Sequence, residues 1–68
     1  MNIGRALKFY RENANLTQGE IADRLGIKEE KYCSYEKDAM NMRLDTLSKF
    51  AELLGVGIVE ILNKAEEY

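Results

Sequence analysis

Apolar residues recur at intervals of three and four in five segments of this 68-residue chain, and no run alternates β-branched with polar residues as a strand would. We therefore predict an all-α fold of five helices, at about residues 3–14, 18–25, 27–37 and 44–54 and from about residue 57 onward. Residues 38–43 are predicted to form a loop. The side chains predicted to face the core are Ile3, Ala6, Leu7, Tyr10, Ile21, Ala22, Leu25, Ile27, Tyr32, Tyr35, Leu44, Leu47, Phe50, Ala51, Leu54, Ile58, Ile61, Leu62 and Ala65.

Capping and turn residues define the second and third helices. Thr17 followed three positions later by Glu20 is a capping box, which predicts a helix that begins at Gln18. Gly26 stands where a left-handed residue would end that helix. Asn15 is predicted to take the same conformation after the first helix. Two short amphipathic helices joined by such a tight turn form a helix-turn-helix.

The helix after Gly26 turns a narrow apolar stripe inward. Tyr32 and Tyr35 form this stripe, and we expect their hydroxyl groups at the rim of the core. The other side chains are polar or small and free to meet a partner: Lys28, Glu29, Glu30, Lys31, Cys33, Ser34 and Lys37. In a helix-turn-helix, the second helix is the element that enters the major groove of DNA.

An ordered set of short motifs along nearly the whole chain carries a family resemblance. The motifs are Ile3-Gly4-Arg5 through Arg11, Leu16-Thr17-Gln18, Ile21-Ala22, Leu25-Gly26-Ile27, Glu36, Leu44-Asp45-Thr46-Leu47, Leu53-Leu54-Gly55-Val56 and Ile61-Leu62. Together they resemble the Cro and phage-repressor type of helix-turn-helix domain, the XRE-like or lambda-repressor-like family. The resemblance implies a five-helix lambda-repressor-like fold and a sequence-specific transcriptional regulator, a repressor, that binds double-stranded DNA.

The resemblance also assigns roles to particular residues. Gln18 corresponds to a glutamine that binds a DNA phosphate and supports the reading helix, at a helix end that favours anions. Lys28, Glu29, Glu30 and Ser34 correspond to positions whose side chains meet base edges. One alternative is that Gln18 is an ordinary exposed residue at the start of its helix. Another is that the run Lys28-Glu29-Glu30-Lys31 is a solvated, charged helix start.

Arg11 and Glu36 match a buried pair that joins the first and third helices in some relatives. We expect this pair to have a structural role, because removal of one partner of a buried ion pair costs about 3–5 kcal/mol. The alternative is that both side chains lie on the surface.

The net charge argues against a nucleic-acid partner. Ten basic and twelve acidic residues give a formal charge of −2, whereas a surface that neutralises phosphates is expected to be basic. However, residues 1–37 have a balance of +1 and residues 38–68 a balance of −3. Because salt screens charges beyond about 8 Å, basic groups beside the groove matter more than the total. The candidate groups are Arg5, Lys8, Lys28, Lys31, Lys37 and Arg43.

Glu29 and Glu30 depart from the neutral or basic residues that relatives carry there. Two carboxylates that face a polyanion weaken binding unless each finds a donor. Either the operator presents cytosine N4 groups to them, or the helix reads something else. Lys28 likewise replaces a Ser or Thr cap, which costs about 1 kcal/mol of helix stability.

Met40, Met42 and Val59 are apolar residues that fit no core stripe. Clustered exposed apolar side chains indicate a partner, so we expect these residues to form the interface of a homodimer. A twofold dimer would place two reading helices about 34 Å apart on successive major grooves. The alternative is that these side chains fold back onto the core of their own chain.

Length and composition narrow the remaining possibilities. A chain of 68 residues allows one domain, residues 1–68. One cysteine and no histidine leave no intramolecular disulfide and disfavour a zinc site. No catalytic constellation or phosphate loop is present, so we expect no enzyme, no cofactor and no small-molecule ligand.

Targeting signals are also missing from the sequence. No apolar run approaches the roughly 18 residues of a membrane span, and the amino terminus lacks the layout of a signal peptide. We therefore expect a cytoplasmic protein without a membrane partner. A second hypothesis is a protein-interaction module of the same fold with weak or no DNA binding, which uses the acidic second half or the exposed apolar residues.

Overall fold

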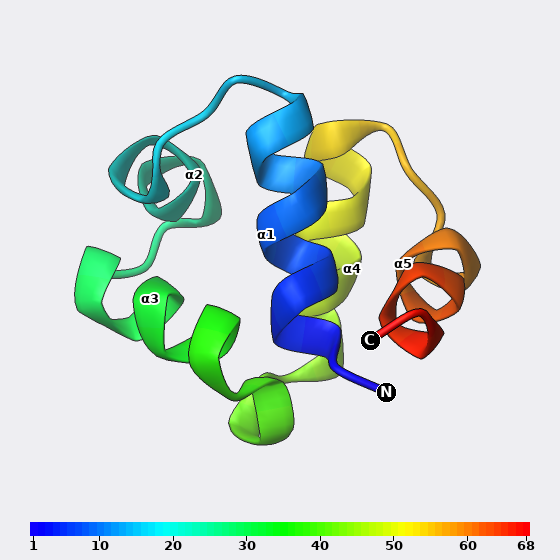
Figure 1. Cartoon of the computed structure of the whole chain (residues 1–68). Helices are drawn as coiled ribbons and strands as arrows, with labels where there is room; N and C mark the ends of the chain where they lie inside the picture. Colours follow the sequence, from blue (N-terminus) through cyan, green and yellow to red (C-terminus); the bar gives the residue numbers. More distant parts are fainter.

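The computed structural model describes all residues 1–68 and contains helices but no strands (Figure 1). The α-helices are α1 (Ile3–Asn13), α2 (Gln18–Leu25), α3 (Glu29–Lys37), α4 (Leu44–Leu54) and α5 (Ile58–Glu66). A short 3₁₀ helix, η1 (Ala39–Asn41), lies between α3 and α4. The predicted all-α fold with five α-helices is confirmed, and the predicted loop at residues 38–43 contains η1.

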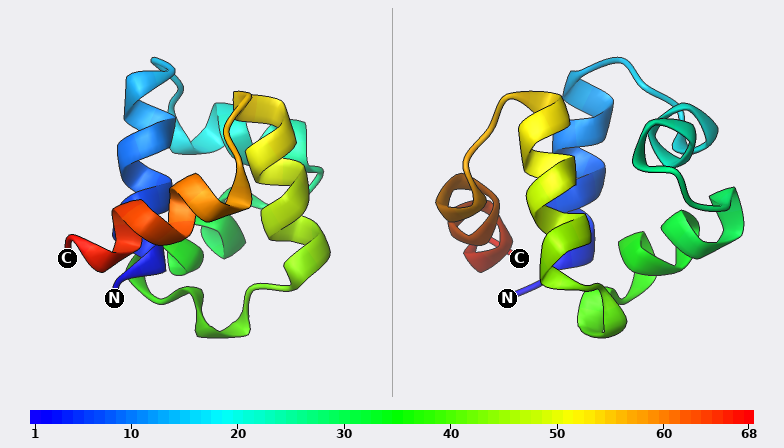
Figure 2. Two further views of the ribbon diagram at one scale, coloured as in Figure 1. Left: turned by 90° about the vertical axis from the view of Figure 1, so that its right-hand side faces the viewer. Right: turned by 180° about the vertical axis from the view of Figure 1, so that it is seen from behind.

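The helices surround one core. α1 and α4 stand apart, and α5 crosses from one to the other on one side of the molecule, while α2 and α3 lie on the other side (Figure 2). α3 packs against both α1 and α2. The two ends of the chain lie together, because the amide of Asn2 donates to the carbonyl oxygen of Ala65 at 3.0 Å.

Every α-helix contributes to a core of 12 buried apolar residues. Tyr32 of α3 and Phe50 of α4 are both fully buried, and their rings stack with centroids 6.3 Å apart. Burial of a side chain of this size stabilises the fold by about 1.5–3 kcal/mol. The stacked pair therefore ties α3 to the far side of the core.

The predicted caps and turns are present. The hydroxyl of Thr17 accepts from the amide of Glu20 at 3.1 Å, and the carboxylate of Glu20 accepts from the amide of Thr17 at 2.9 Å. Gly26 and Asn15 have φ angles of 73° and 58°, as predicted from their places after α2 and α1. Gly55 ends α4 with a φ angle of 68°. Local chemistry therefore defines both ends of α2 and the turn into α3.

Two features of the packing do not follow from the spacing of apolar residues along the chain. Leu44 was expected in the core, but it is 70% exposed, because it is the first residue of α4 and projects beyond the core at that end. Gly4 is buried where α1 crosses α3. A methyl group at Gly4 would overlap the backbone carbonyl of Glu36 and lie 2.7 Å from the carbonyl oxygen of Tyr35. α1 can approach the end of α3 this closely because residue 4 has no side chain.

None of the helices combines the length and the apolar character that crossing a bilayer requires.

Candidate nucleic-acid interface

α3 has one buried side and one exposed side. Tyr32 and Tyr35 are buried in the core, and Cys33 is half-buried beside them. The polar residues of the helix and its cap are all exposed, namely Lys28, Glu29, Glu30, Lys31, Ser34 and Lys37. The surface formed by these six side chains is called the α3 face below. The fold thus leaves the predicted polar side of this helix accessible to a partner.

Arg11 of α1 and Glu36 of α3 form a buried ion pair. Nε of Arg11 donates to Oε2 of Glu36 at 2.6 Å, and Nη2 donates to Oε1 at 3.3 Å. The two side chains are only 10% and 6% exposed. Nη1 of Arg11 also donates to the carbonyl oxygen of Leu16 at 2.8 Å. One guanidinium group therefore joins the end of α3 to α1 and to the segment before α2.

Gln18 completes this buried network. Its amide Nε2 donates to Oε1 of Glu36 at 3.1 Å, so the first residue of α2 is joined to the last turn of α3. Burial alone raises the pKa of the Glu36 carboxyl group, but hydrogen bonds from Arg11 and Gln18 outweigh burial and hold the pKa below its ordinary value. Glu36 is therefore ionised while it holds three helices together.

Tyr32 lies deeper than the sequence suggested. We expected its hydroxyl group at the rim of the core, but that group is fully buried and makes no hydrogen bond. Burial and the nearby Glu36 carboxylate raise the pKa of this hydroxyl group. Nothing in the periodicity of α3 distinguishes a buried hydroxyl from one at the rim.

The basic side chains of the α3 face are unpaired. Lys28, Lys31 and Lys37 form no ion pair in the structure. Arg43, which precedes α4, pairs with Asp45 at 3.5 Å, but both side chains are more than 70% exposed. Such exposed pairs contribute only about 0–1 kcal/mol and exchange readily with another anion.

The remaining base-reading candidates have local contacts. Lys28 makes no side-chain cap hydrogen bond at the start of α3, as predicted. The hydroxyl group of Ser34 donates to the carbonyl oxygen of Lys31 at 2.6 Å. The carboxylate of Glu29 lies beside Gly19 in the first turn of α2. The α3 face therefore presents mixed charges rather than a uniformly basic surface.

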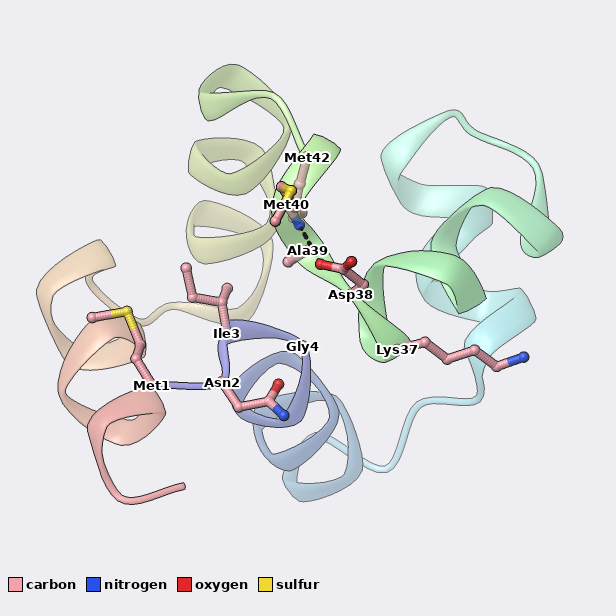
Figure 3. A pocket seen from close by; sticks show the side chains of 9 residues that line it. All are labelled: Met1, Asn2, Ile3, Gly4, Lys37, Asp38, Ala39, Met40 and Met42. Carbon is pink, nitrogen blue, oxygen red and sulfur yellow. Dashed lines mark hydrogen bonds between the residues drawn. The ribbon is translucent and has the colours of Figure 1, made fainter.

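The residues predicted to form a dimer interface lie in different environments. Met40 in η1 and Val59 in α5 are 84% and 68% exposed, whereas Met42 is half-buried and packs against the core. Met40 and Met42 line an open groove of about 490 Å³ between the start of α1 and η1 (Figure 3). Lys37 also borders the groove, but its side chain extends away from the others (Figure 3). No group of three or more metal-binding side chains is present.

A short helix that is held by a preceding helix across a glycine turn, with its polar side free, defines a helix-turn-helix domain. The chain belongs to this family, because the family model described as a helix-turn-helix domain matches residues 4–67. The predicted resemblance to Cro and phage-repressor type domains is confirmed by this match and by the curated relatives.

Three curated relatives are similar to the chain. It is 36% identical over 66 residues to the HTH-type transcriptional regulator ImmR of Bacillus subtilis. The aligned region is 97% of this chain and 52% of that protein. It is 34% identical over 60 residues to the cryptic phage CTXphi transcriptional repressor RstR of Vibrio cholerae, covering 88% of this chain and 54% of the relative. An uncharacterised HTH-type transcriptional regulator of Methanocaldococcus jannaschii is 36% identical over 55 residues, covering 81% of this chain and 83% of that protein.

The chain spans about half the length of the first two of these relatives. No solved structure gives a significant match to it.

Proposed function

We propose that residues 1–68 act as a single unit that binds double-stranded DNA sequence-specifically and inserts the α3 face into the major groove. The observation that carries this proposal is the exposure of all six polar side chains of that face on a helix that the core holds in place. A helix-turn-helix places its second helix in the groove in this way. Lys28, Lys31 and Lys37 are unpaired and available to phosphates.

The positions around α3 support distinct roles within the complex. Gln18 stands at the amino end of α2, where a phosphate is favoured, and its side chain is already oriented by Glu36. Ser34, Glu29 and Glu30 are proposed to meet base edges, and Arg43 to contact a phosphate beyond the end of α3. In this scheme phosphate contacts fix the register and the base contacts select the sequence.

The proposed biological role is that of a transcriptional regulator, a repressor, acting as a homodimer on an inverted-repeat operator. The names of the first two relatives support regulation, and one of them is a phage repressor. A dimer through Met40, Met42 and Val59 would double the phosphate contacts of a domain whose net charge is −2. Two half-sites about 34 Å apart are then expected.

Selection of bound sites from random double-stranded DNA tests this proposal. We expect an enriched inverted repeat, and an affinity that falls linearly with the logarithm of salt concentration with a slope of several units. An enriched site without twofold symmetry would rule out the dimer but retain the α3 face. Failure to enrich any sequence, together with no binding at low salt, would reject the proposal.

The second candidate is a protein-interaction module of the same fold. The exposed side chains of Met40, Leu44 and Val59, together with the acidic balance of residues 38–68, favour it. This candidate predicts no salt-dependent binding to DNA. The selection experiment therefore separates the two functions.

A further inference from the structure

The carboxylate of Glu29 lies against the first turn of α2. Gly19 is the second residue of that helix, and a methyl group placed on it would lie 3.1 Å from Oε1 and 3.5 Å from Cδ of Glu29. Glu29 is the first residue of α3. The contact therefore joins the amino ends of the two helices that make up the helix-turn-helix.

A negative charge is favoured at this place. The first amides of a helix have no acceptor within the helix, and the helix dipole is positive at this end. The capping box supplies an acceptor for the amide of Glu20, but the amides of Gln18 and Gly19 remain without one. Glu29 forms no ion pair with a basic side chain. The carboxylate therefore lies beside the positive amino end of α2 as well as at the amino end of its own helix, α3.

The same turn holds the residue proposed to bind a phosphate. One N–H of the Gln18 side-chain amide donates to Glu36, which leaves its second N–H free for another acceptor. A DNA phosphate that approaches this N–H and the two free amides would come close to the Glu29 carboxylate. Two anions at one helix end repel each other, so the carboxylate has to leave before the phosphate can bind.

We propose that Glu29 is an internal competitor for the DNA phosphate at the amino end of α2. This inference rests on the proposed function, and it assigns to Glu29 the control of affinity at that site. In the free domain the carboxylate remains beside Gly19. On docking, the exposed side chain rotates toward the major groove, where cytosine N4 is the base donor that suits a carboxylate.

The competition affects DNA sequences unequally. A site with cytosine at the matching position provides a new partner for the displaced carboxylate. Any other site leaves that carboxylate unpaired beside the phosphates. Glu29 therefore weakens binding to non-specific DNA more than binding to the cognate site. In this way it raises the ratio of specific to non-specific affinity.

Glu30 offers a matched control for Glu29. It has the same charge, is the next residue of the first turn of α3 and is also exposed, but the three atoms nearest to a methyl group placed on Gly19 all belong to Glu29. Glu29→Gln and Glu30→Gln change the net charge equally and keep similar helix propensities. In the binding of inorganic phosphate, which involves no base contact, a difference between the two variants therefore reports the contact rather than general charge repulsion.

The first experiment uses inorganic phosphate and needs no DNA. Amide chemical shifts of Gln18 and Gly19 are followed by NMR while phosphate is added to the wild type, Glu29→Gln and Glu30→Gln at constant ionic strength. We expect Glu29→Gln to half-saturate at a phosphate concentration about threefold to tenfold lower than the wild type, as removal of a charge at a helix end suggests. Glu30→Gln is expected to stay within about twofold of the wild type. Equal responses of the two variants, or no response in any protein, would overturn the proposal.

The second experiment measures affinity for a random-sequence duplex and for the best selected duplex. Glu29→Gln is expected to strengthen random-duplex binding about threefold to tenfold and to reduce the ratio of specific to non-specific affinity by a similar factor. Glu30→Gln is expected to strengthen random-duplex binding less than Glu29→Gln does, because Glu29 supplies the atoms nearest to Gly19. An unchanged ratio in Glu29→Gln would overturn the proposal even if the domain binds DNA well.

The two experiments separate this inference from the proposed function. If no protein binds either duplex at low salt, the proposed function fails, and the phosphate titration still decides whether Glu29 competes for the anion. Circular dichroism and thermal melting of each variant verify the fold. Because both side chains are exposed, we expect melting temperatures close to that of the wild type.

Discussion

Charged side chains are paired on the buried side of α3 and unpaired on its exposed side. On the buried side, Glu36 is held by Arg11 and Gln18, and every hydrogen bond joins α3 to another helix. On the exposed side, three lysines and two glutamates of the α3 face form no ion pair at all. The first arrangement fixes the position of the helix, and the second leaves charges free for a partner. Stability and recognition are therefore expected to respond to different substitutions.

The largest expected effect is the loss of the buried ion pair. Arg11→Ala should lower the free energy of unfolding by about 3–5 kcal/mol, because it leaves the Glu36 carboxylate buried without its charged partner. Urea denaturation measures this loss. Arg43→Ala is the control, since it removes the exposed pair with Asp45 and should cost at most about 1 kcal/mol. Similar losses in the two variants would show that burial does not distinguish the pairs.

The close approach of α1 to α3 gives the next largest effect. Gly4→Ala should destabilise the fold by about 1–3 kcal/mol, because the added methyl group overlaps the Glu36 backbone, which has no room to move. Gly19→Ala is the matched variant, since its methyl group meets only the end of the flexible Glu29 side chain. It should be neutral or stabilise by up to about 1 kcal/mol, as Ala favours a helix. Thermal melting of the two variants should move in opposite directions or differ clearly in size.

The pH dependence of stability tests the charge state of Glu36. Its pKa in the folded protein lies below the ordinary glutamate value of 4.5, so protons bind preferentially to the unfolded chain. Stability should therefore be fully present above that value and fall as the pH drops through the folded-state pKa. Glu36→Gln should be less stable at neutral pH but lose less on acidification. Urea denaturation of the wild type and of Glu36→Gln across this pH range measures how the free energy of unfolding of each protein depends on pH. An equal dependence in the two proteins would show that Glu36 is not ionised at a lowered pKa in the fold.

The smallest effects are expected on the α3 face. Lys37→Ala should weaken binding to all DNA sequences alike and reduce the salt slope by about one unit. Ser34→Ala should instead relax the preference at one or two base positions and remove part of the roughly 1–3 kcal/mol of discrimination that a base contact provides. Neither change should alter the free energy of unfolding by more than about 0.5 kcal/mol. If both variants lost stability, these side chains would support the fold rather than contact DNA.

Local signals explain why so much of the fold was predictable. The capping box at Thr17 and the left-handed residues Asn15 and Gly26 depend only on neighbouring residues, so the sequence predicted them correctly. The five helices follow from the spacing of apolar residues. The family resemblance, rather than spacing, suggested that Arg11 and Glu36 meet.

The features that the sequence did not predict depend on distant packing. Leu44 continues the apolar stripe of α4 but lies where the helix projects past the core, and periodicity does not indicate where the core ends. The full burial of the Tyr32 hydroxyl and the crowding at Gly4 depend on how α1 and α4 pack against α3. The contact of Glu29 with Gly19 depends on the angle between α2 and α3. The sequence therefore indicated which residues are candidates. Apart from the pair of Arg11 and Glu36 that the resemblance suggested, it did not indicate which residues they contact.

Mapping the DNA contact by NMR shows directly which side of the domain meets the major groove. Amide shifts of the uniformly labelled domain are recorded as the selected duplex is added at low salt, with a random duplex as the comparison. We expect the largest changes on the six residues of the α3 face, on Gln18 and near Arg43, while α5 changes little. Changes centred on α5 or the groove beside η1, with the α3 face unaffected, would contradict it.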